Sequence, residues 1–417
     1  MPTAVSFERN ERVYVQGESA FGIIPNAAGV ATLAAANAMR HIDVSLTPDE
    51  TMIVREDKTG DRTETAGEVG RYMGNFSLKQ THATNGTPGT ACDANPVLES
   101  LFCAANTVRT GTTSVSACTT GAAYSVTTVA PHTWLSGQVV WVPKTAAGAP
   151  WGAFVITVTG ASAFILIGAN SAVSITAATA IARANVEYTL GNLAAKSFDL
   201  WRFRTPATIR QEVGIGCLTA SAKWDAGGDE GQKVDFSGPC KWITDNLSLA
   251  NGVTDSDQNA GLTTFPVEPT SPVTNGTLMA SFLGYAVING VAQAKLRSWS
   301  ISHNSGLALP QEYIGTRYGN EPEAGMRSTL VDFVIDDDDL AGSQLIYQAA
   351  QAATRIDCVF VTGNQTQGNT AVFYVRGVQL KMPKTTAGGQ KFTRSYSQCK
   401  AHGSGVATLD ELKLVHC

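Results

Sequence analysis

The sequence predicts a mainly β protein. Short segments with alternating apolar residues recur along the chain, separated by glycine-rich turns, which is the pattern of strands joined by tight connections. With 417 residues, 43% of them hydrophobic, the chain can bury a sizeable core and favours two domains over one. The predicted strands are 41–48, 69–80, 214–224, 231–242, 295–303, 326–336, 355–363 and 371–382.

Few segments have helical spacing. Residues 96–106 predict one helix, because apolar side chains recur on one face behind Pro96. The stretch LAGSQLIYQAAQAATR after residue 339 predicts a second, with Ile346, Ala349, Ala350 and Ala353 in one stripe. The alanine-rich stretch 28–39 is either a third helix or part of an ordered loop.

Consecutive aspartates end the segment VDFVIDDDDL, residues 331–340. Period-two spacing sends Asp332 and Asp336 to the face opposite the core. Asp338 and Asp339 stand just before the second helix, where a carboxylate caps free N–H groups and favours the helix dipole. The run lacks the alternating ligand positions and turn glycine of a calcium loop, so no metal is expected here.

Charge and motifs argue against several functions. The net charge of -5 and a pI near 5.7 disfavour a protein that grips nucleic acid through its phosphates. Nucleotide-binding, zinc-protease and serine-hydrolase motifs are absent from the sequence, so we expect no enzyme, no catalytic residue and no cofactor. The N-terminus lacks the apolar core of a signal peptide, and no apolar run would span a bilayer, so we expect cytoplasmic synthesis without membrane contact.

The composition changes between about residues 122 and 190. Val, Thr, Ala and Ile dominate there, almost without charge, which predicts a small inserted all-β domain. The expected organisation is a first body segment 1–121, the insertion 122–190 and a second body segment 191–417.

Two of the eight cysteines are predicted to face each other. A two-residue turn at Gly228-Asp229 would join the strands containing Cys217 and Cys240. Paired positions in such a hairpin have a constant sum, and both 228 with 229 and 217 with 240 give 457. The pair would suit a disulfide formed outside the reducing cell; two buried free thiols are the alternative.

The order of these segments resembles the tail tube (major tail) proteins of long-tailed bacteriophages. The segments that carry the resemblance are the opening RVYVQGESAFGIIP, the charged stretch 54–71, the helix PVLESLFCAA, the strand KSFDLWRF, and the run from LRSWSISHNSG through VDFVIDDDDL. The resemblance is one of pattern. Part of the insertion, HTWLSGQVV, resembles small β domains of other phage tail proteins, with Thr133 where glycine often follows the histidine.

The resemblance implies two packed antiparallel sheets with a flanking helix, and hexameric rings stacked into a hollow tube of the virion tail. The implied partners are other copies of the chain, other tail proteins at the tube ends, and phage DNA that passes through without specific binding. Synthesis would take place in the host bacterial cytoplasm. Asp332 and Asp336 would then face the channel or solvent, and the insertion would lie outside the tube.

The polar loop 54–71 is the expected contact between rings. In the family a long loop at this place reaches the next ring, and mixed charges suit complementary contacts between identical subunits. A mobile surface loop is the alternative. The charged residues are Arg55, Glu56, Asp57, Lys58, Asp61, Arg62 and Glu64.

Two other functions compete with this interpretation. A receptor-binding adhesin of the virion would use the insertion as its binding module, and exposed aromatic rings around Trp134, Trp141 and Trp151 would favour it. A secreted enzyme acting on carbohydrate would need paired carboxylates in a groove.

Overall fold

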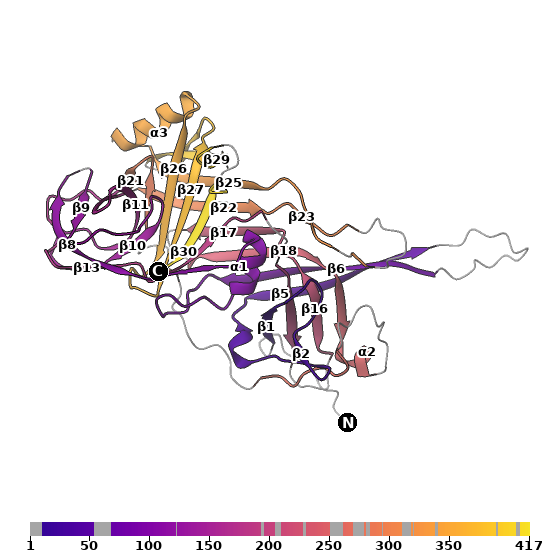
Figure 1. The fold of residues 1–417 in the computed structure, drawn as a ribbon. Helices are drawn as coiled ribbons and strands as arrows, with labels where there is room; N and C mark the ends of the chain where they lie inside the picture. The colour runs from indigo at the N-terminus through magenta and orange to yellow at the C-terminus, as the bar shows by residue number, and fades with distance from the viewer. Residues whose placement is uncertain are drawn as a thin grey trace, which may run out of the picture.

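The chain folds into antiparallel sheets with few helices. The computed structural model describes residues 11–53, 68–121, 123–192, 196–204, 210–227, 231–250, 262–269, 279–280, 284–293, 295–310, 318–319, 321–337, 341–388, 391–405 and 409–417. Within these residues, Figure 1 shows a large sheet at the centre, a small sheet below it, a barrel on the left and a long hairpin reaching to the right.

The large sheet contains most of the predicted strands. Its hydrogen-bonded order is β21 (Val291–Gln293), β20 (Tyr285–Ile288), β26 (Arg355–Gly363), β27 (Thr370–Gln379), β29 (Lys391–Ala401), β25 (Ser328–Asp336), β22 (Leu296–Asn304), β17 (Ser221–Gly227), β18 (Lys233–Cys240), β6 (Glu68–Thr81) and β5 (Asp43–Ile53). Further strands pair alongside this path: β30 (Leu412–His416), β14 (Asn185–Thr189), β7 (Thr107–Arg109) and β28 (Lys384–Gly388).

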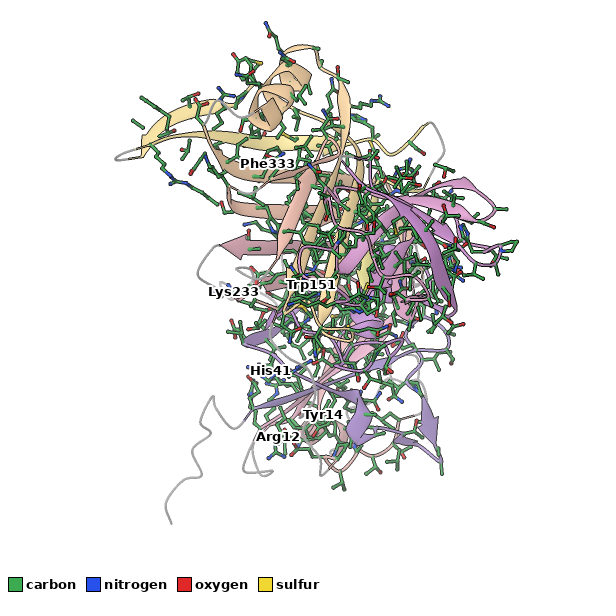
Figure 2. All side chains as sticks on the ribbon, turned by 90° about the vertical axis from the view of Figure 1, so that its left-hand side faces the viewer. Arg12, Tyr14, His41, Trp151, Lys233 and Phe333 are labelled. Carbon is green, nitrogen blue, oxygen red and sulfur yellow. The ribbon has the colours of Figure 1, made fainter. Side chains whose placement is uncertain are left out.

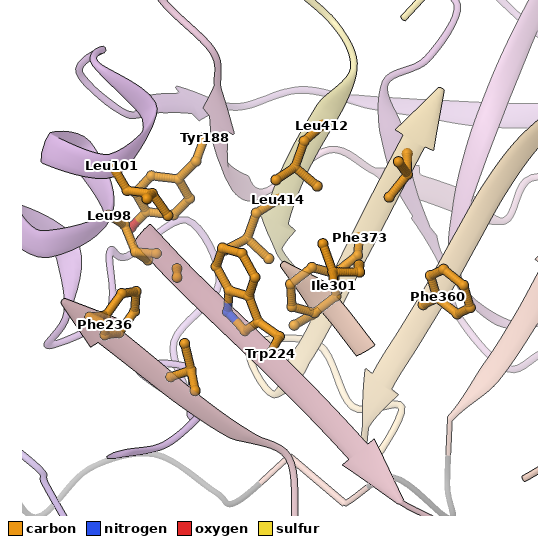
Figure 3. Close-up of a cluster of buried hydrophobic side chains, with 14 of the residues drawn as sticks. Leu98, Leu101, Tyr188, Trp224, Phe236, Ile301, Phe360, Phe373, Leu412 and Leu414 are labelled. Atoms are coloured by element: carbon orange, nitrogen blue, oxygen red, sulfur yellow. The ribbon is translucent and has the colours of Figure 1, made fainter. Parts of the chain in front are cut away.

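The large sheet curls around its own core. The ring centroids of Trp299 on β22 and Phe360 on β26 are 4.9 Å apart, and those of Trp224 on β17 and Phe373 on β27 are 5.5 Å apart. Figure 3 shows the Trp224 indole among Phe373, Leu414 and other buried side chains. Strands β26 and β27 therefore face β17 and β22 across the core, and the outer sides of these two groups point in different directions.

A small sheet packs on the large one. Among the described residues it has the order β19 (Trp242–Asp245), β16 (Glu212–Cys217), β15 (Phe198–Phe203), β1 (Arg12–Gly17) and β4 (Ala38–Met39). Its inner side chains join the main core, where Phe198 meets Phe76 of β6 edge to face at 5.4 Å. Figure 2 shows Arg12 and Tyr14 at this end of the molecule and Phe333 near the other.

The described residues include three α-helices. The predicted helix near 96–106 is present as α1 (Asn95–Phe102), with Val97, Leu98, Leu101 and Phe102 fully buried. The helix predicted after the aspartates is present as α3 (Ala341–Gln351), whose Ile346 is fully buried. A short α2 (Asn246–Ala250) follows β19.

The alanine-rich stretch 28–39 is not an α-helix. It contains β3 (Val30–Ala31), which pairs with β2 (Asn26–Ala27), a 3-10 turn η2 (Ala35–Asn37), and strand β4. Strand pairing favours the extended conformation over a helix here, because Met39 lies opposite Val13 of β1 and is buried in the core. A short hairpin of β23 (Leu307–Ala308) and β24 (Glu323–Ala324) lies elsewhere on the surface.

The insertion is a closed β-barrel with boundaries that differ from the prediction. Its strands, among the described residues, are β8 (Thr112–Thr119), β9 (Ser125–Thr128), β10 (Val139–Val142), β11 (Gly152–Gly160), β12 (Ala163–Leu166) and β13 (Ala180–Ala182). The predicted range 122–190 starts too late, because β8 pairs with β9 and β13. It also ends too late, because β14 pairs with β30 and β7 of the large sheet.

The barrel packs firmly on the large sheet. Valine and alanine side chains on the outside of β10 and β11 meet the outer side of β20, β26, β27 and β30 in one buried cluster. Its buried members are Val139, Ala153, Val155, Val287, Val359, Val361, Val372, Tyr374, Val415 and Cys417. The barrel is thus part of the packing of the body.

Removing the barrel is expected to make the body insoluble. The ends of the barrel meet where the Arg183 N–H donates to the Gly111 carbonyl at 2.8 Å, so a short Gly/Ser linker can replace residues 112–182. The deletion exposes the valines beneath, and such a patch promotes aggregation. The soluble fraction measures this; adding V359T, V361T and V372T to the deletion should restore it, and a soluble deletion without these changes would contradict the covering role.

Candidate functional surface

One broad outer face of the large sheet is open and polar. Alternation along β25 buries Val331, Phe333 and Ile335 and turns the residues between them outward. The same alternation runs through β5, β6, β18, β17 and β22, and we call the outward side of these six strands the serine face. Its uncharged polar members include Ser45, Ser77, Ser221, Ser237, Ser298, Ser300, Ser302, Asn304 and Ser328.

Charges of opposite sign alternate across the serine face. In one row, neighbouring strands place Asp43 opposite Lys79, Lys79 opposite Asp235, and Asp235 opposite Lys223. In the next row, Lys233 lies opposite Asp225. Each opposite pair in a sheet contributes under about 1 kcal/mol, so the rows set the surface charge more than the stability.

The lysines of these rows lie within reach of carboxylates. Lys79 Nζ is 3.6 Å from Asp235 Oδ1, and Lys223 Nζ is 3.0 Å from Asp225 Oδ2. These side chains are about half exposed, so solvent and salt screen the pairs. Lys79 and Lys223 are therefore locally balanced by carboxylates.

Two shallow hollows lie on the serine face. One, of about 470 Å³, is lined by residues including Ser77, Lys223, Ser237 and Ser302. The other, of about 250 Å³, is lined by residues including Asp225, Ser298 and Asp332. Their linings carry serine hydroxyl groups and charged side chains, which hydrogen-bond to water.

Asp332 and Asp336 lie on the non-core side of β25. Asp332 accepts hydrogen bonds from the Gln398 backbone N–H and, at 3.4 Å, from the Ser300 hydroxyl, and it lines the smaller hollow. Asp336 forms ion pairs with Arg297 and Lys391. Asp332 therefore belongs to the serine face, and Asp336 ties the end of β25 to its neighbours β22 and β29.

Two sets of predicted residues lie outside the described residues. They are the helix-capping residues Asp338 and Asp339, and the ring-stacking residues Arg55, Glu56, Asp57, Lys58, Asp61, Arg62 and Glu64. Both sets stay predictions from the sequence.

The long hairpin of β5 and β6 leads to the predicted ring-stacking residues. Strands β5 and β6 pair as far as Met52 opposite Val69 and Ile53 opposite Glu68. Figure 1 shows this end of the hairpin well beyond the body. Met52 and Ile53 at this end are each 59% exposed. We call residues 49–53 and 68–72 the arm.

Cys217 and Cys240 come together, but not by the predicted hairpin. Paired positions of β17 and β18 sum to 458, one more than predicted, so the predicted register of these two strands is wrong by one residue. Pairs of β16 and β19 sum to 457, and Cys217 belongs to β16. The two thiols are free and fully buried, with their Sγ atoms 2.8 Å apart.

Three buried histidines have no access to solvent for chemistry. His82 and His416 meet with their Nε2 atoms 3.2 Å apart, and His303 Nδ1 lies 2.8 Å from the Thr329 hydroxyl. Burial lowers the pKa of His82 and of His303 to about 3, and burial together with His82 lowers the pKa of His416 well below its usual value. All three are neutral core residues at neutral pH.

Acidification is therefore expected to weaken the fold. A histidine with a folded pKa below its unfolded value of about 6.5 contributes its full stability above pH 6.5 and loses it as the pH falls toward the folded pKa. Each such group removes up to about 1.4 kcal/mol per pH unit. Urea unfolding between pH 7 and pH 5 measures the slope; H82Q/H416Q should flatten it strongly, and H402N should flatten it much less, because His402 is only partly buried. An unchanged slope in H82Q/H416Q would contradict this origin.

The part of the chain that the structure describes holds no group of three or more His, Cys, Asp or Glu side chains placed to bind a metal ion. None of its helices is long and apolar enough to cross a membrane.

Sequence reasoning missed the serine face. The signal is visible in LRSWSISHN, where Ser298, Ser300 and Ser302 alternate with Trp299 and Ile301. What the sequence alone does not provide is the neighbouring strands, which decide that serines and paired charges from six strands form one surface. No protein-family model matches the chain, and no curated protein matches its sequence.

Proposed function

We propose that this chain is a tail tube protein of a long-tailed bacteriophage. In this proposal, hexameric rings stack into a hollow tube, the serine faces line the channel, and DNA passes through without chemistry. The observation that carries the proposal is the serine face itself: a broad, open, hydroxyl-rich sheet surface whose lysines are matched by carboxylates.

Such a surface suits the passage of DNA. Binding to DNA is driven mainly by lysine and arginine replacing the counterions of the phosphates. A lysine already opposite an aspartate gains less from a phosphate, and the extra carboxylate of Asp332 adds repulsion. Serine hydroxyls keep the wall hydrated. DNA would therefore meet a wet wall with no strong point of attachment.

The arm supports stacking of rings. It carries exposed Met52 and Ile53 and leads directly into the mixed-charge segment with Glu56 and Asp57, so it offers apolar area and complementary charge to a second copy of the chain. Strand β5 is also an edge of the large sheet among the described residues, and an unpaired edge is protected when another copy covers it.

The barrel would then lie outside the tube. It covers the outer side of β26 and β27, which face the strands of the serine face across the core. A wall with the serine face toward the channel leaves the barrel on the far side of each subunit.

The rival adhesin gains no support from the aromatic residues of the barrel. Trp134 is only 5% exposed and packs in the barrel core, and Trp141 packs against the large sheet. Trp151 is half-buried under the Lys144 ammonium, 5.3 Å from its ring. Electron microscopy of the purified chain tests the proposal, because rings or hollow tubes are expected, and compact trimers or monomers would oppose it.

A further inference from the structure

Cys217 and Cys240 come together at the corner between the small and the large sheet. The chain runs from β16 in the small sheet into β17 in the large sheet, and returns through β18 and β19. At the corner Thr219 and Ala220 lie opposite Gly238 alone, which is a β-bulge. The bulge changes the sum of paired positions from 458 to 457 and brings Cys217 opposite Cys240.

Hydrogen bonds fix the two cysteines in this position. The Leu218 N–H donates to the Pro239 carbonyl at 2.9 Å, and the Lys241 N–H donates to the Gly216 carbonyl at 3.3 Å. Bonds on both sides of a facing pair define a non-hydrogen-bonded pair, whose Cα atoms are about 4.5 Å apart in antiparallel sheets. That spacing is at the short end of the range found in disulfides.

The surroundings leave room for the bridge. A methyl group added at Gly214 would lie 2.9 Å from Cys217 Sγ and 3.4 Å from Cys240 Sγ, so the glycine keeps the space beside the two sulfurs open. Both side chains are fully buried, and burial raises the pKa of Cys217 well above its usual value. Little thiolate forms in the folded chain, so oxidation is expected to be slow, and burial of the two sulfurs should slow later reduction because an external thiolate cannot reach them.

We propose that Cys217 and Cys240 form a disulfide that ties the small sheet to the large sheet once the chain meets an oxidant. With oxidised glutathione, the two protein thiols lose their hydrogens to form one S–S bond, and the glutathione disulfide is reduced to two glutathione thiols. This inference is independent of the proposed function.

Peptide mapping of the full chain tests the bond directly. The protein is incubated with oxidised glutathione in two arms, one folded and one during refolding from urea, then alkylated and digested with trypsin. Cleavage after Arg210, Lys223, Lys233 and Lys241 leaves each cysteine alone on its peptide, 211–223 and 234–241. We expect these two peptides to be linked in the refolding arm; their absence from both arms, or linkage to other cysteines, would overturn the proposal.

Thermal unfolding tests the consequence. A disulfide that closes the loop from Cys217 to Cys240 should raise the midpoint temperature of unfolding by roughly 5 °C. A phosphine reductant added during refolding should abolish the increase. C103A, which removes a different thiol, should keep the increase, whereas C217A/C240A should lose it. If C217A/C240A fails to fold, the peptide map still decides. A linked pair with an unchanged midpoint would overturn the tying role.

Discussion

Replacing Asp43, Asp225 and Asp235 with asparagine is expected to make the chain bind duplex DNA more tightly. The change leaves Lys79, Lys223 and Lys233 without the carboxylates opposite them, so their counterions can be replaced by phosphates. The slope of log affinity against log salt should become more negative by about 2 to 3, as expected for three new phosphate contacts. Binding to duplex DNA between 50 and 200 mM salt measures it.

A variant with the same added charge elsewhere provides the control. V129K/L135K/A147K places three lysines on exposed positions of the barrel, away from the serine face. The folded state should survive in both variants, because each exposed ion pair contributes about 1 kcal/mol or less. Equal DNA binding by the two variants would show that DNA affinity depends on net charge alone. The paired charges of the serine face would then not be what keeps DNA from binding.

The second large effect is expected at the arm. Changing Met52 and Ile53 to serine should leave the subunit folded and stop tubes from elongating, because both side chains are exposed in the single chain and have only an intermolecular contact to lose. Burying the exposed 59% of both side chains contributes about 2 to 4 kcal/mol, and the loss recurs in every subunit of a ring. Circular dichroism checks the fold, and tube length by electron microscopy checks elongation.

The matched control again uses the barrel. V129S/L135S removes two apolar side chains that are 68% and 66% exposed, so the composition changes equally. Tubes of normal length are expected from this variant. Tubes of normal length from M52S/I53S would exclude the arm as a stacking contact.

The strands could be predicted from the sequence because their periodicity is local. Strand 355–363 is confirmed to the residue as β26, and 326–336 is confirmed as β25 with Phe333 in the core. The stretch 214–224 was expected as one strand and is two, because the bulge at Gly238 turns the chain from one sheet into the other. A corner of this kind depends on the partner strand, which a local pattern does not contain.

The surface and the barrel show the same limit. Low charge indicates an inserted domain, but composition does not show which strands pair. The predicted range 122–190 therefore leaves out β8 of the barrel and includes β14 of the large sheet. The constant sum of 457 that predicts the pair of Cys217 and Cys240 holds for β16 with β19. It does not hold for the hairpin of β17 and β18. The serine face needs six strands in order, and only the fold supplies that order.

Cryo-electron microscopy of the purified, assembled chain tests whether the serine face lines the channel of a tube. We expect hollow tubes of stacked hexameric rings, with Lys223, Asp235 and Ser300 facing the channel and the barrel on the outside. Compact trimers, monomers, or a tube whose channel is lined by the barrel instead of the serine face would contradict it.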